Sequence, residues 1–376
     1  MMPMRPPRLV QIVYALSPGG SELLATRLAS RLNRDGRYAA AVYAVAHGGT
    51  LEPTLAAEGL AYRAFGRASA IDVPAFRRLL SALKAARPAI VHTHHLGQLL
   101  YGGLAARLAG ARVVHTEHEF YTLAAPRHRR LLRALSSIAD VITAVAPPVA
   151  SFLAREVGIP REKLKTISNG VEVDLYRTAK PVDREIWGWS RNEQVLACIG
   201  RLSREKGQRV LLEAFRAVSR RRPDARLLLV GDGPDREALT ALASEWGLDG
   251  TVYFAGARVD VPNVLAASDI VVLPSHHEGL PLVALEAMAA ARPVVATAVG
   301  ALPALLNNGA HGRLAPAGNP TALAEAIGGL LEDRPEQARL GAIGHDLVAR
   351  EYNFEATLRQ YARVYDGVVA RAGRRR

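Results

Sequence analysis

The chain has 376 residues, 49% of them hydrophobic, which is enough for two ordinary domains with well-formed cores. Its single cysteine, Cys198, excludes internal disulfides and cysteine-based metal clusters. No window approaches the roughly 18 apolar residues of a membrane-spanning helix, and no signal peptide is recognisable, so we expect a cytoplasmic protein.

The net charge of +13 is concentrated in the first half of the chain. Residues 1–170 contain 22 Lys and Arg against 10 Asp and Glu, whereas residues 171–376 contain 26 against 25. Such an excess predicts attraction to an anionic partner, such as a membrane surface or a lipid-linked phosphate. Because 43 of the 48 basic residues are Arg, compositional bias of the genome explains the excess equally well. No nucleic-acid-binding motif accompanies the charge, and we expect no nucleic-acid partner.

Apolar runs alternate with helical patterns from the N-terminus to about residue 170, which indicates a doubly wound parallel sheet. Ligands of such sheets bind at the carboxyl ends of the strands. After the first strand, Gly19 and Gly20 are compatible with a backbone that approaches a phosphate and equally with a simple tight turn. The expected strands are 8–16, 39–46, 89–93, 112–116, 141–145 and 164–167, and the expected helices are 23–32, 50–58, 73–86, 99–108, 127–138 and 149–156.

Five of the eleven histidines lie at the ends of two of these strands. Alternation along the strand predicts that His92 and His94 share one face of the sheet and that His95 lies on the other. A metal site is one interpretation of this cluster, but no carboxylate accompanies these three, and we expect no metal. The second group is His115 and His118, and His118 is expected at the carboxyl edge of the sheet. There it would hydrogen-bond a substrate or be a satisfied structural histidine.

A second alternating series follows residue 170, and its first strand ends at Gly200. Arg201 and Lys206 come next, in a basic loop that opens a helix. At the carboxyl end of a strand these two cations suit a pyrophosphate, although isolated Arg and Lys residues are usually surface charges. The expected strands are 195–199, 226–230, 251–254, 270–273 and 293–297, and the expected helices are 210–218, 236–246, 323–331, 336–350 and 354 to about 369.

The most informative stretch is residues 269–289, which reads as a buried strand, a short polar loop and a helix. The helix is expected to begin near Gly279 or Leu280, with Pro281 in its first turn. Its N-terminus offers backbone N–H groups and a positive dipole end to an anion, most simply a phosphate.

Two carboxylates flank that helix start. Glu278 precedes it and Glu286 follows about two turns later, roughly 12 Å away if the segment is helical. This separation suits carboxylates that hold the two ends of an elongated ligand with an anionic middle, such as a nucleotide diphosphate-sugar. The alternative is an ordinary loop residue and a solvated helix residue. Against it, Glu286 has apolar neighbours, where an unpaired charge would be costly.

A series of short motifs spans nearly the whole chain. They are Gly19-Gly-Ser-Glu22, Thr116-Glu-His118, Ser168-Asn-Gly-Val171, Gly200-Arg-Leu202, Glu205-Lys-Gly207, Val230-Gly-Asp-Gly233, residues 267–275, Glu278-x7-Glu286 and residues 293–297. In order and spacing, these motifs resemble those of the retaining GT-B glycosyltransferases of family 4. The resemblance implies two Rossmann-like domains that face each other across a cleft. Residues 1–170 would bind the acceptor and residues 171–353 the nucleotide-sugar, with a last helix at about 354–370 packed back on the first domain.

By position, the resemblance implies that Arg201 and Lys206 bind the diphosphate and that Glu286 binds the ribose hydroxyls. It assigns Glu278 to the donor sugar hydroxyls and His118 to the sugar near the reacting carbon. Fixed cations and a helix start would stabilise the leaving diphosphate without a metal, and no cofactor is implied beyond the nucleotide-sugar co-substrate. The remaining donor-site positions are Gly19, Gly20, Gly200, Gly279, Leu280 and Pro281.

One departure from the family pattern follows strand 293–297. The segment Gly300-Ala-Leu-Pro-Ala304 lacks the Glu that family members often carry, which removes one implied donor-side contact. The sequence therefore predicts a metal-independent hexosyltransferase that moves a sugar from a UDP- or GDP-sugar to an acceptor hydroxyl with retention, in surface polysaccharide or glycolipid assembly. The alternatives are a nucleotide-sugar epimerase of the same fold and a non-catalytic nucleotide-binding partner subunit.

The acceptor is the least determined partner. The basic first half, with the run Arg127-His-Arg-Arg-Leu-Leu-Arg133, favours a lipid-linked acceptor glycan and a peripheral position on the inner face of the membrane. The nucleotide base, the sugar and the linkage stay open.

Overall fold

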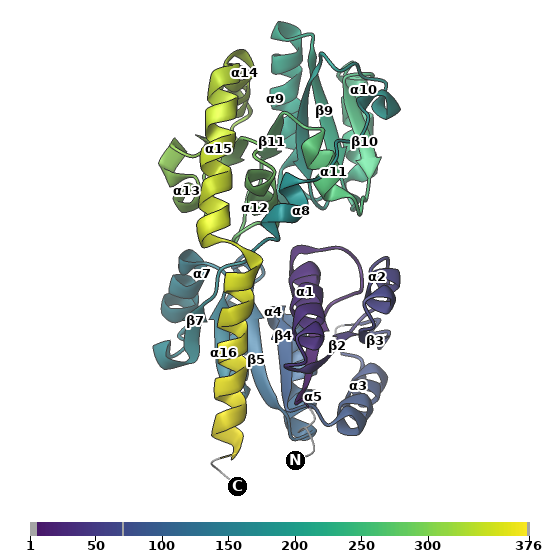
Figure 1. The fold of residues 1–376 in the computed structure, drawn as a ribbon, viewed down its shortest axis with the longest axis vertical. Helices are drawn as coiled ribbons and strands as arrows, with labels where there is room; N and C mark the ends of the chain where they lie inside the picture. The colour runs from purple at the N-terminus through teal and green to yellow at the C-terminus, as the bar shows by residue number, and fades with distance from the viewer. Residues whose placement is uncertain (1–5, 70, 374–376) are drawn as a thin grey trace. The chain divides into compact units, whose positions relative to one another are not determined.

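The computed structural model describes residues 6–69 and 71–373, and the chain divides into two compact units. The first unit runs to Asn169 and takes up the chain again from Thr357, and the second is Gly170–Ala356. Each unit is built on one parallel β-sheet with helices packed around it (Figure 1). No helix among the described residues is long and apolar enough to cross a membrane.

The sheet of the first unit has seven strands in the order β3-β2-β1-β4-β5-β6-β7. The order reverses between β1 and β4, the point at which doubly wound sheets bind their ligands. The strands are β1 Arg8–Val13, β2 Ala39–Ala44, β3 Ala61–Ala64, β4 Ile90–His94, β5 Arg112–Glu117, β6 Val141–Ala144 and β7 Leu164–Thr166. The helices are α1 Gly20–Arg34, α2 Glu52–Ala57, α3 Val73–Ala86, α4 His95–Gln98, η1 Leu99–Gly103, α5 Leu104–Leu108, α6 Pro126–Leu135, η2 Ser136–Ile138, α7 Pro147–Phe152, η3 Leu153–Val157 and η4 Arg161–Lys163.

The sheet of the second unit has six strands in the order β10-β9-β8-β11-β12-β13, with the reversal between β8 and β11. The strands are β8 Gln194–Ile199, β9 Ala225–Val230, β10 Val252–Gly256, β11 Ile270–Leu273, β12 Val294–Thr297 and β13 Arg313–Ala315. The helices are α8 Val173–Arg177, η5 Arg184–Trp187, η6 Arg204–Lys206, α9 Gln208–Arg221, α10 Arg236–Glu245, α11 Val261–Ala266, α12 Leu282–Ala289, α13 Leu302–Leu305, η7 Asn307–Gly309, α14 Pro320–Glu332 and α15 Arg334–Glu351.

Local sequence explains the boundaries of the longer elements. Helix α3 begins where the Asp72 carboxylate accepts a hydrogen bond from the Ala75 N–H at 2.8 Å, with Pro74 in the first turn. It ends at Arg87, which has a left-handed φ of 46°. The central strands β1, β4, β6 and β11 are almost wholly buried, as expected for parallel strands covered on both faces.

The C-terminal helix α16, Phe354–Gly373, belongs to the first unit from Thr357 onward. Its side chains Tyr361 and Tyr365 are fully buried and hydrogen-bond polar groups of β1, β4 and β5. The Thr357 hydroxyl also donates to the Ser168 carbonyl at 2.9 Å. The helix is therefore an integral part of the layer that covers this sheet.

Several short elements were not expected from the sequence. They are the edge strands β3 and β13 and the short helices α8, α11 and α13. The segment 180–192 contains η5 and buries the indoles of Trp187 and Trp189. Helix α12 begins at Leu282 rather than near Gly279 or Leu280, because Pro281 is its extended N-cap with ψ of 124°.

Candidate functional site

The basic loop after β8 is held by glycine. Gly207 ends η6 with φ of 69°, and a Cβ there would lie 2.1 Å from the Pro274 carbonyl oxygen. Only glycine fits this approach, so the loop that carries Lys206 packs against the segment that follows β11. The His276 N–H reinforces the contact by donating to the Glu205 carbonyl at 2.8 Å. The Arg201 side chain is exposed, and its carbonyl accepts from Gln208 Nε2 at 2.8 Å.

Lys206 and Glu278 form an ion pair. Lys206 Nζ lies 2.8 Å from Glu278 Oε1, and the Ser275 hydroxyl donates to the same oxygen at 2.7 Å. Glu278 is only 7% exposed, whereas the Lys206 side chain is 31% exposed. The Thr297 hydroxyl fixes Ser275 in turn by donating to its carbonyl at 2.5 Å. A carboxylate that is this buried and this well bonded has a fixed orientation.

The segment between Glu278 and α12 is braced by residues that follow β12. The Ala301 N–H donates to the Gly279 carbonyl at 2.9 Å, and Gly300 has φ of 58°. A Cβ on Gly300 would lie 2.0 Å from the Glu278 carbonyl oxygen. The backbone at Gly279, Leu280 and Pro281 therefore leads directly to the N-terminus of α12, whose dipole favours an anion.

Glu286 lies inside the apolar helix α12 and is 6% exposed. The buried hydroxyl of Tyr176, on the short helix α8, donates to Glu286 Oε1 at 2.6 Å. Sequence reasoning missed Tyr176, because α8 is only five residues long and lacks a helical apolar pattern. The only sequence signal was that a Glu surrounded by apolar residues requires a hydrogen-bond donor from elsewhere.

The electrostatics around the basic loop favour fixed charges. Burial raises the pKa of Glu205, but the Ser203 hydroxyl, a backbone hydrogen bond, Arg201 and Lys206 outweigh burial and lower it overall. Cys198 at the end of β8 is buried, which raises the pKa of its thiol to about 12 despite the nearby Lys206. The cysteine is therefore a protonated core residue.

His118 follows directly after β5 in the first unit, at the carboxyl edge of that sheet as predicted. Its Nε2 lies 2.9 Å from His94 Nδ1, and its ring centroid lies 4.7 Å from that of His95. Burial, and then the neighbouring His95, His94 and His115, hold the pKa of His118 well below its usual value. The imidazole is therefore neutral near pH 7.

The other strand-end histidines follow the predicted alternation only in part. His92 and His94 share one face of the sheet, with ring centroids 4.3 Å apart. The prediction for His95 was wrong, because β4 ends at His94 and His95 turns away with a left-handed φ of 65°. Its Nε2 lies 3.1 Å from the Ser21 hydroxyl at the start of α1.

The glycine turn after β1 forms the start of α1. Gly19 is the extended N-cap and Gly20 the first helical residue. A Cβ on Gly19 would lie 2.5 Å from a carboxylate oxygen of Glu22 in the first turn. Gly19 and Gly20 thus lie at the N-terminus of α1, the end of a helix that favours an anion, beside the Glu22 carboxylate.

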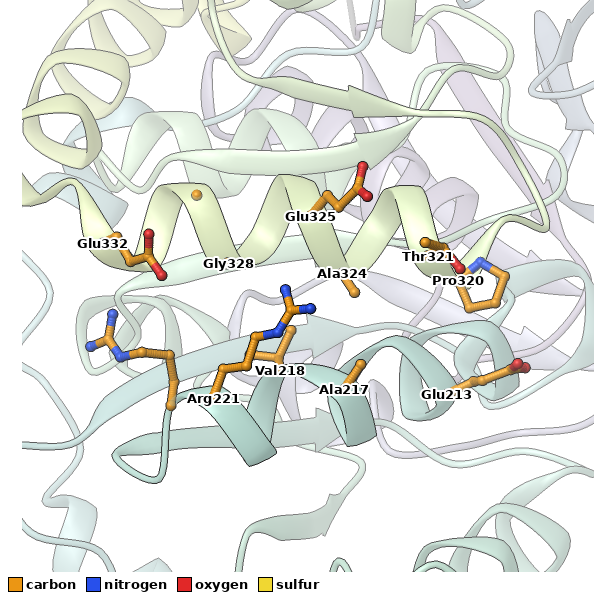
Figure 2. A pocket seen from close by; sticks show the side chains of 12 residues that line it. Glu213, Ala217, Val218, Arg221, Pro320, Thr321, Ala324, Glu325, Gly328 and Glu332 are labelled. Carbon is orange, nitrogen blue, oxygen red and sulfur yellow. The ribbon is translucent and has the colours of Figure 1, made fainter.

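A metal site and a surface groove are the remaining candidates for chemistry. In the described part of the chain, no group of three or more His, Cys, Asp or Glu side chains is arranged to hold a metal ion. A groove of about 420 Å³ lies between α9 and α14 (Figure 2), with Glu213, Ala324 and Gly328 among its lining residues. None of the predicted site residues lines it.

The structure thus joins the predicted residues into separate clusters. Within the second unit, Lys206 contacts Glu278, and Gly200 ends the strand that leads to them, its N–H donating to the Val230 carbonyl at 2.9 Å. Glu286 has its own hydroxyl partner on α8. His118, Gly19 and Gly20 belong to the first unit.

Two family models match the chain. Residues 18–175 match glycosyltransferase family 4, and residues 193–333 match glycosyl transferases group 1. The D-inositol 3-phosphate glycosyltransferase of Corynebacterium glutamicum is 30% identical over 310 residues, which cover 75% of this chain and 72% of that protein. The chain belongs to the family 4 glycosyltransferases.

A second relative and a solved structure are also similar to this chain. The N-acetyl-alpha-D-glucosaminyl L-malate synthase of Bacillus anthracis is 29% identical over 288 residues, covering 74% of this chain and 75% of that protein. The Anabaena HepE structure in complex with UDP-glucose superposes with a TM-score of 0.83 at 24% identity, over 96% of this chain and all of that one. The family 4 assignment and the two parallel-sheet units together define a GT-B glycosyltransferase.

Proposed function

We propose that this glycosyltransferase transfers a sugar, with retention, from a UDP- or GDP-sugar to an acceptor hydroxyl. The observation that carries the proposal is the ion pair of Lys206 with the buried Glu278, directly before the N-terminus of α12. A cation and a helix start in one place suit the two charges of a diphosphate. The fixed Glu278 carboxylate beside them suits the hydroxyls of the sugar that is attached to the diphosphate.

Lys206 and Arg201 are proposed to hold the diphosphate. Cleavage of the sugar–phosphate bond leaves negative charge on the departing oxygen, and groups that are already oriented stabilise it most. Lys206 is oriented by Glu278 and by the loop that Gly207 holds in place. Arg201 is exposed and would close on the ligand as a second cation.

Glu286 is proposed to accept hydrogen bonds from the ribose. Tyr176 donates to Oε1, which orients the carboxylate. Two neighbouring ribose hydroxyls match a carboxylate well, because a ribose donates through both and a carboxylate accepts through two oxygens. In the first unit, His118 is proposed to contact the donor sugar, and Gly19 and Gly20 to bring backbone N–H groups to the diphosphate.

Metal independence is part of the proposal. The positive charge of Lys206, Arg201 and the start of α12 would take the place that a divalent cation has in many nucleotide-using sites. We expect initial rates in excess EDTA to equal those with added Mg²⁺ or Mn²⁺. A rate that requires the cation would reject this part of the proposal and leave the donor site to be reassigned.

The acceptor is proposed to be a lipid-linked glycan at an anionic membrane surface. Helix α6 carries four arginines, and its apolar side is formed by the buried residues Leu132 and Leu135. Basic residues on one helix are attracted to anionic headgroups. The related enzymes act on acceptors named as L-malate and D-inositol 3-phosphate, both of which are anionic.

The first experiment is a thermal-shift screen across nucleotide sugars, because a true donor stabilises the folded state by mass action. UDP-glucose is the first donor to test, since HepE holds it in the same fold. A donor present at about 100 times its Kd adds about 2.7 kcal/mol to the free energy of unfolding. The anomeric configuration of the product, read by NMR, then tests retention.

The second experiment measures nucleotide release with and without acceptor. We expect release to require the acceptor and to fall at least about 100-fold in Glu278→Ala and Lys206→Ala. The matched controls Glu213→Ala and Lys180→Ala remove exposed charges elsewhere in the second unit and should leave the rate unchanged. Conversion of the donor without any acceptor would instead support an epimerase.

A further inference from the structure

A continuous chain of hydrogen-bonded side chains lies beneath His118 in the first unit. It connects the sheet with the C-terminal helix α16, and sequence analysis assigned no function to most of its members. All except His118 are almost completely buried. The members are Gln11 on β1, His92 and His94 on β4, Thr116 on β5, Thr143 on β6, and Tyr361 and Tyr365 on α16.

The direction of these hydrogen bonds follows from chemistry at one end. Gln11 Oε1 lies 2.9 Å from His94 Nε2, and a carbonyl oxygen only accepts, so His94 donates through Nε2. A neutral imidazole has one N–H, so His94 Nδ1 must accept. Its partner, at 2.9 Å, is His118 Nε2, which therefore carries the proton. The proton on Nε2 leaves Nδ1 of His118 as an acceptor.

The same orientation of the Gln11 amide sets the direction of the hydrogen bonds on its other side. Gln11 Nε2 donates to the Tyr365 hydroxyl at 3.2 Å, and that hydroxyl donates to His92 Nδ1 at 2.7 Å. His92 Nε2 then donates to Thr116 Oγ1 at 2.7 Å. Every step follows from the previous one, because each hydroxyl and each neutral ring has a single proton to give.

The series of hydrogen-bonded side chains ends at a second carbonyl oxygen, that of His115. The Thr116 hydroxyl donates to the Thr143 hydroxyl at 2.5 Å, and the Thr143 hydroxyl donates to the His115 carbonyl oxygen at 3.3 Å. If the Gln11 amide were reversed, Thr143 would have to donate to Thr116, and the His115 carbonyl would lose its bond. With the Gln11 amide donating to Tyr365, the hydrogen bonds at both ends are made, and no buried polar group of the series is left without a partner.

The groups that face His94 and His118 are uncharged, which favours neutral imidazoles in this series of hydrogen-bonded side chains. They are the imidazoles of His92, His95 and His115 and the hydroxyl of Tyr365, joined by Gln11. Two carboxylates on neighbouring segments have other partners: Glu117 Oε1 lies 3.0 Å from His115 Nε2, and Glu22 accepts a hydrogen bond from the Ser21 hydroxyl at 2.7 Å. Burial lowers the pKa of His92 and His94, in agreement with neutral rings.

We propose that Tyr365, Gln11 and His94 are positioning residues that hold His118 as the neutral tautomer protonated at Nε2, with Nδ1 presented to the substrate. The inference rests on the proposed contact of His118 with the donor sugar. It deepens that contact, because Nδ1 accepts a hydrogen bond from a sugar hydroxyl and cannot donate one to a phosphate oxygen. A donor without the matching hydroxyl should lose rate, as should one in which it is methylated.

The test reads the tautomer directly, in the full chain without donor, from long-range ¹H–¹⁵N NMR correlations of the histidine side chains. In the wild type we expect His118 to be protonated at Nε2 at pH 7. Tyr365→Phe should mix the two tautomers, because Gln11 then loses the hydroxyl that orients its amide. Gln11→Glu should raise the pH at which His118 and His94 take up a proton by about one unit or more, since a carboxylate stabilises an imidazolium.

Tyr38→Phe is the matched control. It removes a hydrogen bond to Asp366, which also lies on α16, at 2.8 Å, but keeps the ring that packs against Tyr365. It should therefore leave the tautomer and the pH profile of kcat/KM unchanged. In Gln11→Glu the acidic limb of that profile should move up with the NMR titration, a shift that mere loss of packing would not produce.

Two results would overturn the proposal: an Nδ1-protonated His118 in the wild type, or an unchanged tautomer and titration in folded Gln11→Glu and Tyr365→Phe. If neither variant folds, the wild-type tautomer alone decides. Because the NMR experiment contains no donor, its result is independent of whether the chain transfers the proposed sugar.

Discussion

The carboxylate of Glu286 owes its orientation in part to the Tyr176 hydroxyl, 2.6 Å away. Tyr176→Phe keeps the ring and removes that bond, so the carboxylate would be less well fixed for the ribose. We expect UDP or GDP to bind about 10- to 100-fold more weakly, since a hydrogen bond to a charged group contributes about 1.5–3 kcal/mol and about 1.4 kcal/mol is a factor of ten. Isothermal titration calorimetry measures the change.

Tyr253→Phe is the control for that measurement, because Tyr253 is 39% exposed and its ring contacts Trp189 away from Glu286. It should bind nucleotide as the wild type does. Equal affinities of Tyr176→Phe and the wild type for UDP and GDP would contradict a ribose role for Glu286.

Gly207 offers a second test at the level of one residue. In Gly207→Ala the added Cβ would meet the Pro274 carbonyl at 2.1 Å, in a residue whose φ is already 69°. Gly188→Ala is matched to it, because φ is 76° there and nothing lies within 4 Å of the new Cβ. Left-handed strain costs about 1–2 kcal/mol in both, and the clash adds to it only at Gly207.

Urea unfolding of both variants separates the two contributions. Gly207→Ala should lose more free energy of unfolding than Gly188→Ala, and it alone should lose nucleotide binding, because the Lys206 loop must move. If the two variants are equally stable and bind alike, the packing of the loop against Pro274 is not required for the site.

Among single residues, the sequence predicted those whose surroundings are local. Lys206, Glu278 and His118 were recognised because each follows the carboxyl end of a strand or precedes a helix. Tyr176, Gln11 and Tyr365 were not recognised, because their partners lie far away in the chain: Tyr176 is separated from Glu286 by 110 residues and Gln11 from Tyr365 by 354. Periodicity reports what one element buries, and it contains no information on such pairs.

At the level of elements, the long helices and the buried strands were predicted, and the exceptions have physical causes. Strand β3 is an edge strand whose first three residues are exposed, so it lacks the apolar run that marks the central strands. Helix α12 starts late because the Gly279 carbonyl accepts from the Ala301 N–H instead of from a residue of its own helix. Both exceptions are decided by tertiary contacts.

The buried histidines of β4 and β5 make the stability of the first unit depend on pH. Burial, which is the larger cause, and neighbouring imidazoles hold the pKa of His92, His94 and His118 well below 6.5 in the folded state. Below pH 6.5 the unfolded state therefore binds more protons than the folded state, and stability falls as the pH is lowered. Carboxylates with lowered pKa, such as Asp224 and Asp260, act only near and below pH 4.

We therefore expect the midpoint of thermal unfolding to fall between pH 6.5 and 5, above the pH at which an ordinary carboxylate is half protonated. Scanning calorimetry at several pH values measures it, and protons taken up on unfolding at pH 5.5 confirm the sign. His92→Gln should reduce the dependence on pH in that window. A midpoint that is constant from pH 7 to 5 would contradict neutral buried rings.

At the scale of the whole molecule, the excess of positive charge in residues 1–170 has two explanations, attraction to a membrane or a bias toward Arg. Exposed arginines on α6 allow a test. Arg127→Glu with Arg130→Glu changes the net charge by as much as Arg209→Glu with Arg220→Glu, which lie on the exposed side of α9 in the second unit. Total charge is therefore matched, and only its location differs.

Liposome sedimentation at low salt compares the two double variants. If α6 faces an anionic surface, its variant should bind vesicles that contain phosphatidylglycerol roughly 30-fold more weakly, from about 1 kcal/mol per basic residue near the surface. The α9 variant should bind like the wild type, and neither should bind neutral vesicles. Equal partitioning of the wild type into neutral and anionic vesicles would reject the membrane explanation and leave the arginines to compositional bias, because a specific attraction must depend on the charge of the lipid.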